Sequence, residues 1–266
     1  MRQRHELRRR EDRGGRERGE KIYLYGKHAL MEALENAPHV IRKVFLSGDA
    51  ARDRDLHEAL AKSNIPVAGI KGAEAGRMVG DDTAHQGVIA IADPSKLVID
   101  FHDFMGGLEI SERTMLVLLD ELHDPHNVGA IIRSAAAFGA SGVLMPPHHQ
   151  AGITGAVVKA SAGMVFRVPI VRIGNVNQVV DALAKAGFCT YALAMDGRRS
   201  VSEEPFDVPS LIIVGNEGHG IRQKTLERAD VGLRIPMDPR CESLNASVSA
   251  AIVMQHWSGK HPEAIR

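Results

Sequence analysis

The sequence of 266 residues has few of the features that mark membrane or secreted proteins. It contains only two cysteines, Cys189 and Cys241, which are too few and too far apart for a disulfide framework or a thiolate metal cage. It has no apolar run of about 18 residues, so we expect no membrane-spanning helix. No apolar stretch follows its first arginines, so we expect no cleavable leader. The pattern favours a reducing, cytoplasmic environment.

The chain also lacks a net charge, because 33 basic residues balance 33 acidic ones. Residues 1–21 nevertheless hold nine of the basic and five of the acidic side chains, which gives this segment about +4 and the rest about −4. We interpret residues 1–21 as a disordered basic arm. Such an arm predicts contact with a polyanion through the release of counterions from phosphates, and the alternative is a solvated terminus without a partner.

The rest of the composition is that of an ordinary globular protein, with 44% hydrophobic and 25% charged residues. Within residues 22–92, short apolar runs alternate with amphipathic helical patterns, which predicts a small α/β domain. Residues 93–113 show no clear period and contain Gly106-Gly107, so we place an interdomain linker there. The expected strands are 22–26, 43–47, 66–70 and 86–92, and the expected helices are 28–36 and 53–63.

From Thr114 the apolar runs become longer, which predicts a second domain over residues 114–266. Strands that are apolar on both faces and joined by helices indicate a parallel sheet covered by helices on each side. Ligands of such sheets bind beyond the carboxyl ends of the strands. The expected strands are 115–119, 142–145, 190–194, 211–214 and 231–235, and the expected helices are 128–138, 155–162, 177–186, 223–229 and 246–257.

The first of three polar segments that follow expected strands runs from Asp124 to Arg133. We expect Asn127 to cap helix 128–138, and Gly129 and Ala130 to let a ligand or another backbone approach closely. Arg133 lies on an otherwise apolar helix and needs an anionic or hydrogen-bonding partner if it is buried. A solvent-facing arginine is the alternative.

The other two polar segments cover residues 214–220 and 243–247. The three alternating glycines of 215–220 predict positive φ angles and exposed backbone amides at a helix N-terminus. In the last segment Ser243 or Asn245 could cap the final helix. The hydroxyl and amide groups of 243–249 exceed what one cap requires, which indicates a polar ligand.

In order and spacing, the three segments resemble the SpoU/TrmH family of RNA ribose 2′-O-methyltransferases, which belongs to the SPOUT superfamily. Residues 22–92 resemble the substrate-binding domain of that family at Tyr25-Gly26-Lys27-His28-Ala29 and Ala84-His85-Gln86-Gly87-Val88. The resemblance implies a C-terminal trefoil knot of about 210–250, S-adenosylmethionine as cofactor, RNA as partner, and a homodimer. Within the family, the chain resembles the enzymes that methylate a guanosine ribose in large-subunit ribosomal RNA.

The same resemblance implies roles for individual residues. Cofactor-binding residues would be Gly215, Asn216, Gly220, Ile235 and Leu244, and catalytic residues would be Asn127, Arg133, Glu217, Ser243 and Asn245.

In the family, the counterpart of Arg133 is thought to activate the 2′-hydroxyl, but a guanidinium does not deprotonate in proteins. We expect Arg133 to stabilise the developing alkoxide and to orient the 3′-phosphate. The proton could pass to Glu217, to the phosphate or to water, with His126 and His219 as further candidates. We expect no catalytic metal, because the adjacent pair His148-His149 has no carboxylate at ligand spacing.

Two other classes of function compete with this interpretation. A non-catalytic RNA-binding protein would need only the N-terminal domain and the basic arm, and would not need the polar residues of the second domain. A nucleotide-dependent oxidoreductase would place its glycine loop after the first strand, with an acidic residue about twenty positions on. Neither feature is present. Within the methyltransferases, transfer RNA remains the alternative to ribosomal RNA.

Overall fold

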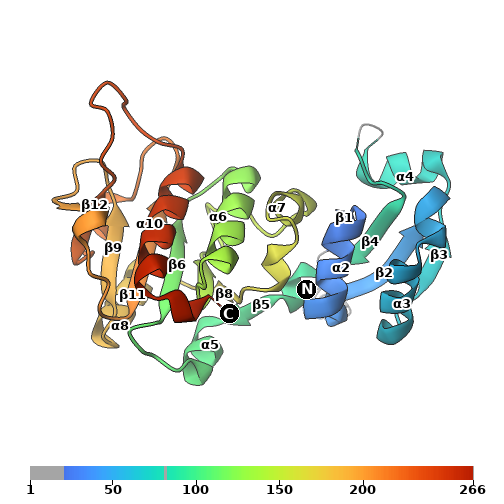
Figure 1. The fold of residues 1–266 in the computed structure, drawn as a ribbon, viewed down its shortest axis with the longest axis horizontal. Helices are drawn as coiled ribbons and strands as arrows, with labels where there is room; N and C mark the ends of the chain where they lie inside the picture. Colours follow the sequence, from blue (N-terminus) through green and yellow to red (C-terminus); the bar gives the residue numbers. More distant parts are fainter. Residues whose placement is uncertain (1–20, 81–82, 266) are drawn as a thin grey trace, which may run out of the picture.

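The computed structural model describes residues 21–80 and 83–265, which form two α/β domains side by side (Figure 1). Apart from Lys21, the basic arm predicted for residues 1–21 lies outside the described residues. Within the described part of the chain, no helix is both long and apolar enough to cross a bilayer.

The N-terminal domain is a four-stranded sheet in the order β1-β4-β2-β3, in which β2 and β3 are parallel and the other pairs are antiparallel. Apolar side chains of α2 and α3 pack on one face of the sheet, and Ala75 of α4 packs on the other. The elements are β1 (Ile22–Tyr25), α2 (Lys27–Asn36), β2 (Ile41–Leu46), α3 (Arg54–Ser63), β3 (Val67–Gly69), α4 (Gly72–Val79) and β4 (Val88–Ala92).

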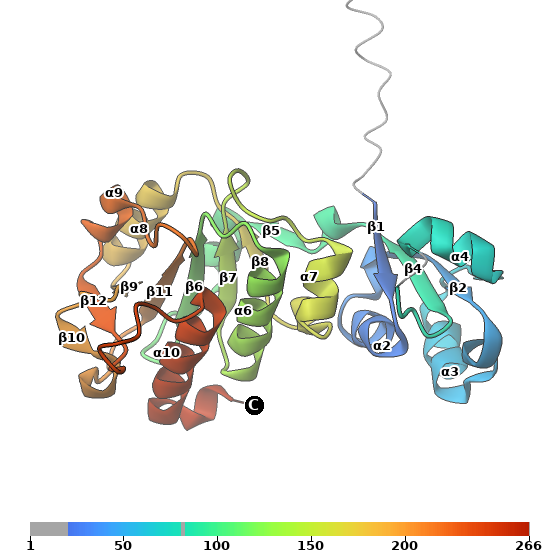
Figure 2. The same cartoon turned by 90° about the horizontal axis from the view of Figure 1, so that it is seen from above.

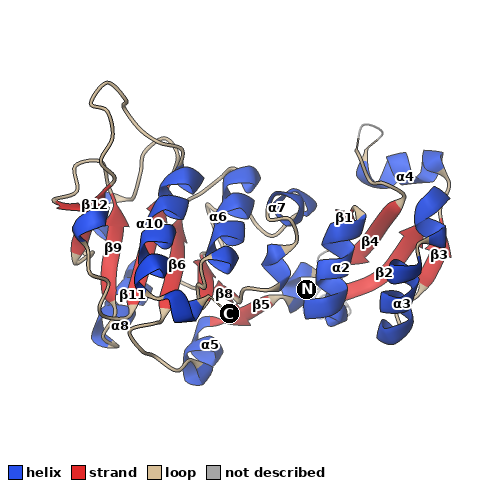
Figure 3. Cartoon of the chain, in the orientation of Figure 1, coloured by secondary structure: helices blue, strands red, loops and turns tan. Residues whose placement is uncertain are grey.

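The second domain is an eight-stranded sheet in the order β10-β12-β9-β11-β6-β7-β8-β5, in which every pair is parallel (Figure 3). The predicted parallel sheet is therefore confirmed. Its strands are β5 (Val98–Asp100), β6 (Met115–Asp120), β7 (Gly142–Met145), β8 (Ile170–Arg172), β9 (Cys189–Leu193), β10 (Arg199–Ser200), β11 (Ser210–Gly215) and β12 (Val231–Arg234). Its helices are α5 (Phe101–Gly107), α6 (Pro125–Ala137), α7 (Gly155–Ala160), α8 (Val176–Lys185), α9 (Gln223–Leu226) and α10 (Ala246–Lys260).

Helices cover both faces of this sheet, as predicted, because its central strands are apolar on both sides. In β6, Met115, Val117 and Leu119 face the core under α6, α7 and α10. Leu116 and Leu118 face the core under α8. Figure 2 shows α6, α7 and α10 on one side of the sheet and α8 on the other.

Part of the segment expected to be a linker, residues 93–113, is instead part of the second domain. Residues 98–100 pair with β8 as the edge strand β5, and α5 follows directly. Phe101, Phe104 and Met105 of α5 are partly buried against the large sheet. The segment had no clear period because the strand is only three residues long and only one side of α5 packs. The remaining connections are residues 93–97, which contain the short 3-10 helix Pro94–Lys96, and residues 108–114.

Candidate active site

The carboxyl ends of the central strands place the three polar segments at one edge of the large sheet. Gly215 at the end of β11 pairs in register with Asp120 at the end of β6. The first segment follows β6 and the second follows β11, so these two lie next to each other. The segment of residues 235–245 leaves β12, projects beyond the sheet and returns to α10 (Figure 1).

A chain of side-chain hydrogen bonds joins the three segments. Asn127 Nδ2 donates to Glu217 Oε1 at 2.9 Å, and Asn245 Nδ2 donates to Asn127 Oδ1 at 2.9 Å. Asn127 is buried, whereas Glu217 and Asn245 are exposed. The buried amide thereby orients a carboxylate and a second amide, each of which keeps an outer surface for a ligand.

The structure corrects the role expected for Asn127 at the start of α6. The helix begins at Pro125, and the side chain of Asp124 caps it by accepting from the His126 backbone N–H at 2.8 Å. Proline is favoured in the first turn of a helix, where its missing N–H needs no partner, and this moves the start three residues towards the N-terminus. Asn127 therefore does not cap the helix, and its side chain contacts the other two segments.

The loop after β11 is closed on itself. The backbones of Asn216 and Gly220 exchange two hydrogen bonds of 2.9 Å, and Asn216 Oδ1 accepts from the N–H groups of Gly218 and His219. Asn216 Nδ2 donates to the Glu121 carbonyl at 2.7 Å, which ties the loop to the end of β6.

The three glycines of this loop differ in their surroundings, and only one has the predicted positive φ. Gly220 has a φ of +70°. Gly215 is needed for close approach, because a Cβ there would lie 2.3 Å from the Gly220 carbonyl carbon and from the Ile221 nitrogen. A Cβ on Gly218 would meet only the Asn216 side chain, at 3.5 Å. The loop also does not open directly onto a helix, since α9 begins at Gln223.

An ion pair fixes the far end of the same loop. Arg222 Nη2 lies 2.6 Å from Asp120 Oδ1, and Arg222 Nη1 lies 3.0 Å from Glu121 Oε1. The Asp120 side chain is fully buried. A buried carboxylate needs such a partner, so this pair holds the loop against β6.

In the third segment, Asn245 is the cap of α10, one of the two residues proposed for it. Its Oδ1 accepts from the N–H groups of Ser247 and Val248, while its Nδ2 reaches Asn127. Ser243 and Leu244 are exposed, and no hydrogen bond of the Ser243 hydroxyl is found among the described residues. Ile235 is partly buried against the main core. The cofactor contacts expected for Ile235 and Leu244 stay predictions.

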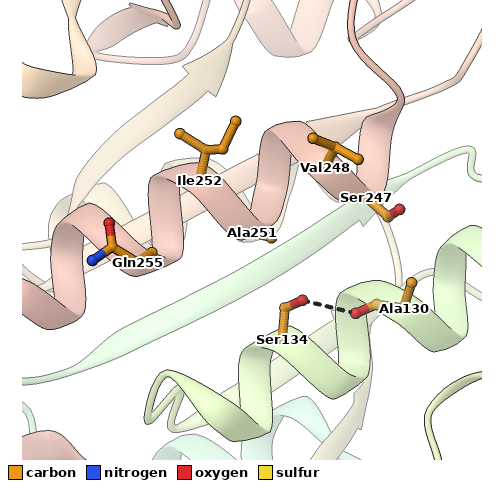
Figure 4. A pocket seen from close by; sticks show the side chains of 7 residues that line it. All are labelled: Ala130, Ser134, Ser247, Val248, Ala251, Ile252 and Gln255. Carbon is orange, nitrogen blue, oxygen red and sulfur yellow. Dashed lines mark hydrogen bonds between the residues drawn. The ribbon is translucent and has the colours of Figure 1, made fainter.

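Arg133 is not brought to the Asn127 cluster. It is exposed on α6, and its guanidinium has no hydrogen bond or ion pair with any residue in 21–80 or 83–265. On the neighbouring strip of α6, Ala130 and Ser134 face α10 across a shallow groove of about 430 Å³ (Figure 4). The other residues that line the groove are Ser247, Val248, Ala251, Ile252 and Gln255.

Gly129, in contrast, fits a backbone neighbour and not a ligand. A Cβ at this position would lie 2.5 Å from Ala160 Cβ and 2.8 Å from the Val157 carbonyl oxygen. The small residue therefore lets α6 and α7 pack closely together.

Sequence reasoning missed the loop that follows β9, which ends beside β11 and β12. Ala194 donates its N–H to the Leu233 carbonyl at 3.0 Å, and a Cβ on Gly197 would lie 2.7 Å from the Gly232 carbonyl oxygen. Met195 in this loop is 60% exposed. The signal was available, because the polar turn residues Asp196-Gly197 directly follow the apolar run of an expected strand.

The residues at this edge fit a nucleoside-like cofactor. Met195 and Leu244 are exposed apolar side chains that a ring system can cover, and Glu217 and Asn245 are exposed polar ones. His126 and His219 are exposed, and their rings make no hydrogen bond within the described residues. No cluster of three or more potential metal ligands is found in that part of the chain.

Comparison with known families identifies the class of protein that this fold and site define. Residues 114–255 match the SpoU rRNA Methylase family, and residues 23–98 match the family described as RNA 2′-O ribose methyltransferase substrate binding. The chain belongs to the SpoU methylase family. As a member of this family, it is an S-adenosylmethionine-dependent RNA 2′-O-methyltransferase.

Individual relatives cover most of the chain. It is 34% identical to the 23S rRNA (guanosine-2′-O-)-methyltransferase RlmB of Photobacterium profundum, over 87% of this chain and 94% of the relative. It is 32% identical to an uncharacterized tRNA/rRNA methyltransferase of Mycobacterium avium, over 88% of this chain and 76% of the relative. Among solved structures, the SpoU methyltransferase AviRb from Streptomyces viridochromogenes, in complex with the cofactor AdoMet, has a TM-score of 0.78 and 23% identity, and the match covers 91% of each chain.

Proposed function

We propose that this enzyme methylates the ribose 2′-hydroxyl of a guanosine in large-subunit ribosomal RNA. The hydrogen-bonded chain from Glu217 through Asn127 to Asn245 carries the proposal, because it assembles the three segments into one polar surface. The 34% identity to RlmB over nearly the whole chain supports the choice of RNA and of guanosine. A transfer RNA is the second candidate, since the M. avium relative is named a tRNA/rRNA methyltransferase.

Each residue of the site then has a task in the transfer. The cofactor, when bound, supplies a sulfonium methyl group that the hydroxyl oxygen can attack. Asn127 holds Glu217 in place, so that the carboxylate can accept the proton that the hydroxyl loses. Arg133, which has no partner among the described residues, is available to the 3′-phosphate and to the developing alkoxide. Gly215, Asn216, Gly220, Ile235 and Leu244 form the cofactor site, and Ser243 lines it.

We further propose that the enzyme is a homodimer. The groove between α6 and α10 is lined mainly by apolar side chains, and Val248 on its rim is 46% exposed. Such a surface is stabilised when another apolar surface covers it. A second copy of the chain would also bring its own Arg133 to this face.

The domain roles and the chain path are part of the same proposal. Residues 22–92 would bind the RNA, residues 114–266 would carry the transfer, and 210–250 would form the trefoil knot. The two free cysteines, Cys189 and Cys241, agree with a reducing cytoplasm as the place of action.

The test is transfer of labelled methyl groups from S-adenosylmethionine to unmodified large-subunit ribosomal RNA made by transcription, followed by mapping of the methylated ribose. We expect transfer to one guanosine and a loss of about 100-fold or more in Arg133→Ala, because removing one group that stabilises a developing oxyanion typically costs this much. Arg113→Ala is the matched control, since Arg113 is half exposed and paired with Glu263 at the opposite end of β6.

Two other outcomes would exclude ribosomal RNA as the substrate. Transfer to transfer RNA alone would replace the substrate proposed here. Methylation of neither RNA would exclude both candidate substrates.

A further inference from the structure

The two domains meet in a buried boundary formed by β1 and α2 on one side and by α7 and residues 163–167 on the other (Figure 2). A single cluster of buried apolar side chains extends through this boundary. It includes Leu24 and Leu30 of the N-terminal domain together with Val157 and Phe166 of the second domain. Two domains that share a core are held together by more than the chain connection between them.

Two glycines bring the backbones of the domains into contact. A Cβ on Gly155 would lie 2.4 Å from the Tyr23 carbonyl oxygen. A Cβ on Gly163, which has a φ of +81°, would lie 2.8 Å from Glu32 Cβ. A side chain at either position would push the domains apart, so the close approach depends on glycine.

An ion pair with two parallel hydrogen bonds crosses the same boundary. Arg167 Nε donates to Glu32 Oε2 at 2.6 Å, and Arg167 Nη2 donates to Glu32 Oε1 at 3.1 Å. Glu32 is only 7% exposed, and its hydrogen bonds raise the pKa of Arg167. Because two parallel hydrogen bonds require the guanidinium and the carboxylate to lie close to one plane, the pair restrains an orientation as well as a distance.

We propose that Arg167 and Glu32 are positioning residues that hold the substrate-binding domain at one fixed orientation to the active site. Separating the pair would leave the buried Glu32 carboxylate without a cationic partner and with only the Asn36 amide, whose Nδ2 lies 3.3 Å from Glu32 Oε2, which is strongly unfavourable. The domain of residues 22–92, proposed above to bind RNA, then stays at a constant distance from Asn127. The enzyme selects RNA whose folded shape spans both domains, and this specificity rests on the function proposed above.

Spin labels on the two domains test the fixed orientation without any measurement of activity. The labels would be placed at Lys62→Cys on α3 and Lys185→Cys on α8, both exposed, in a Cys189→Ser and Cys241→Ser background. Labelled chains would be mixed with an excess of unlabelled chains, so that only distances within one chain are measured. We expect one narrow distance distribution that broadens in Arg167→Met and stays narrow in the control Arg113→Met, which removes the exposed ion pair of Arg113 with Glu263 within the second domain.

A second substitution separates this positioning role from a general loss of folding. Arg167→Lys keeps a positive charge beside the buried carboxylate but cannot form both parallel hydrogen bonds, so the distribution should stay broad while the protein remains folded. We expect Arg167→Met to lower kcat/KM on the full ribosomal RNA by about tenfold, because a misplaced substrate loses rate steeply. Cofactor affinity and the rate on a short fragment around the mapped nucleotide should stay unchanged, which shows that the catalytic domain is folded.

A broad distance distribution in the unsubstituted protein would overturn the inference. So would a narrow distribution in Arg167→Met together with an unchanged kcat/KM. If the unsubstituted protein methylates no RNA while its distribution is narrow and depends on Arg167, the proposed function fails and the fixed orientation stands.

Discussion

At the scale of single residues, Gly215 offers a direct test of how tightly the loop after β11 is packed. Gly215→Ala places a Cβ 2.3 Å from the backbone of Gly220 and Ile221, which cannot yield as a side chain can. We expect a loss of about 3 kcal/mol in the free energy of unfolding, the upper end of the usual cost of overpacking. Urea denaturation measures it, and cofactor affinity should fall as well.

Gly218→Ala is the matched control in the same loop, because its Cβ would meet only a side-chain oxygen at 3.5 Å. Equal stability of the two variants would show that residues 215–221 do not pack as described.

The sequence allowed the polar residues of the site to be singled out, but not their partners. Asn127 was expected to be a cap because it precedes an apolar helical pattern, and nothing local shows that Asp124 takes that task. Its two partners, Glu217 and Asn245, lie 90 and 118 residues further along the chain. Arg133 was expected to need an anionic or hydrogen-bonding partner only if it were buried, and its side chain is exposed.

At the scale of the helix, α6 depends on the Asp124 cap for its start. We expect Asp124→Ala to lower the free energy of unfolding by about 1 kcal/mol, the typical cost of losing an N-cap. Asp124→Asn should retain nearly the full stability, because asparagine caps as well as aspartate does. Thermal unfolding of both variants measures the difference. If both variants lose the same free energy of unfolding, the charge of Asp124 stabilises the helix and its capping hydrogen bond does not.

Elements with a clear apolar pattern could be predicted from the sequence, whereas a helix whose residues disfavour helical structure could not. The apolar runs of β6 and β11 are buried on both faces, so their pattern is unambiguous. No helix was expected at α4, whose sequence contains Gly72 and Gly76, and glycine disfavours helices. The helix forms because tertiary contacts of Ala75 and Met78 with the sheet compensate for that preference.

At the scale of the whole molecule, the proposed homodimer can be disrupted by one charge in the groove between α6 and α10. We expect Val248→Asp to shift the protein from dimer to monomer, since burying an unpaired carboxylate at an apolar interface is costly. Light scattering during gel filtration measures the mass. The control is Val67→Asp, because Val67 is 44% exposed on the edge strand β3 and Val248 is 46% exposed. A dimer that persists in Val248→Asp would place the interface elsewhere.

The hydrogen bond between Asn245 and Asn127 also has a consequence for how the protein folds. It closes a loop of 118 residues, and contacts so distant along the chain form late because their closure entropy must be compensated first. During synthesis, α6 and β6 are complete long before residue 245 leaves the ribosome. The site is therefore assembled last, so a chain that ends between β12 and Asn245 contains all eight strands of the sheet but not the complete site.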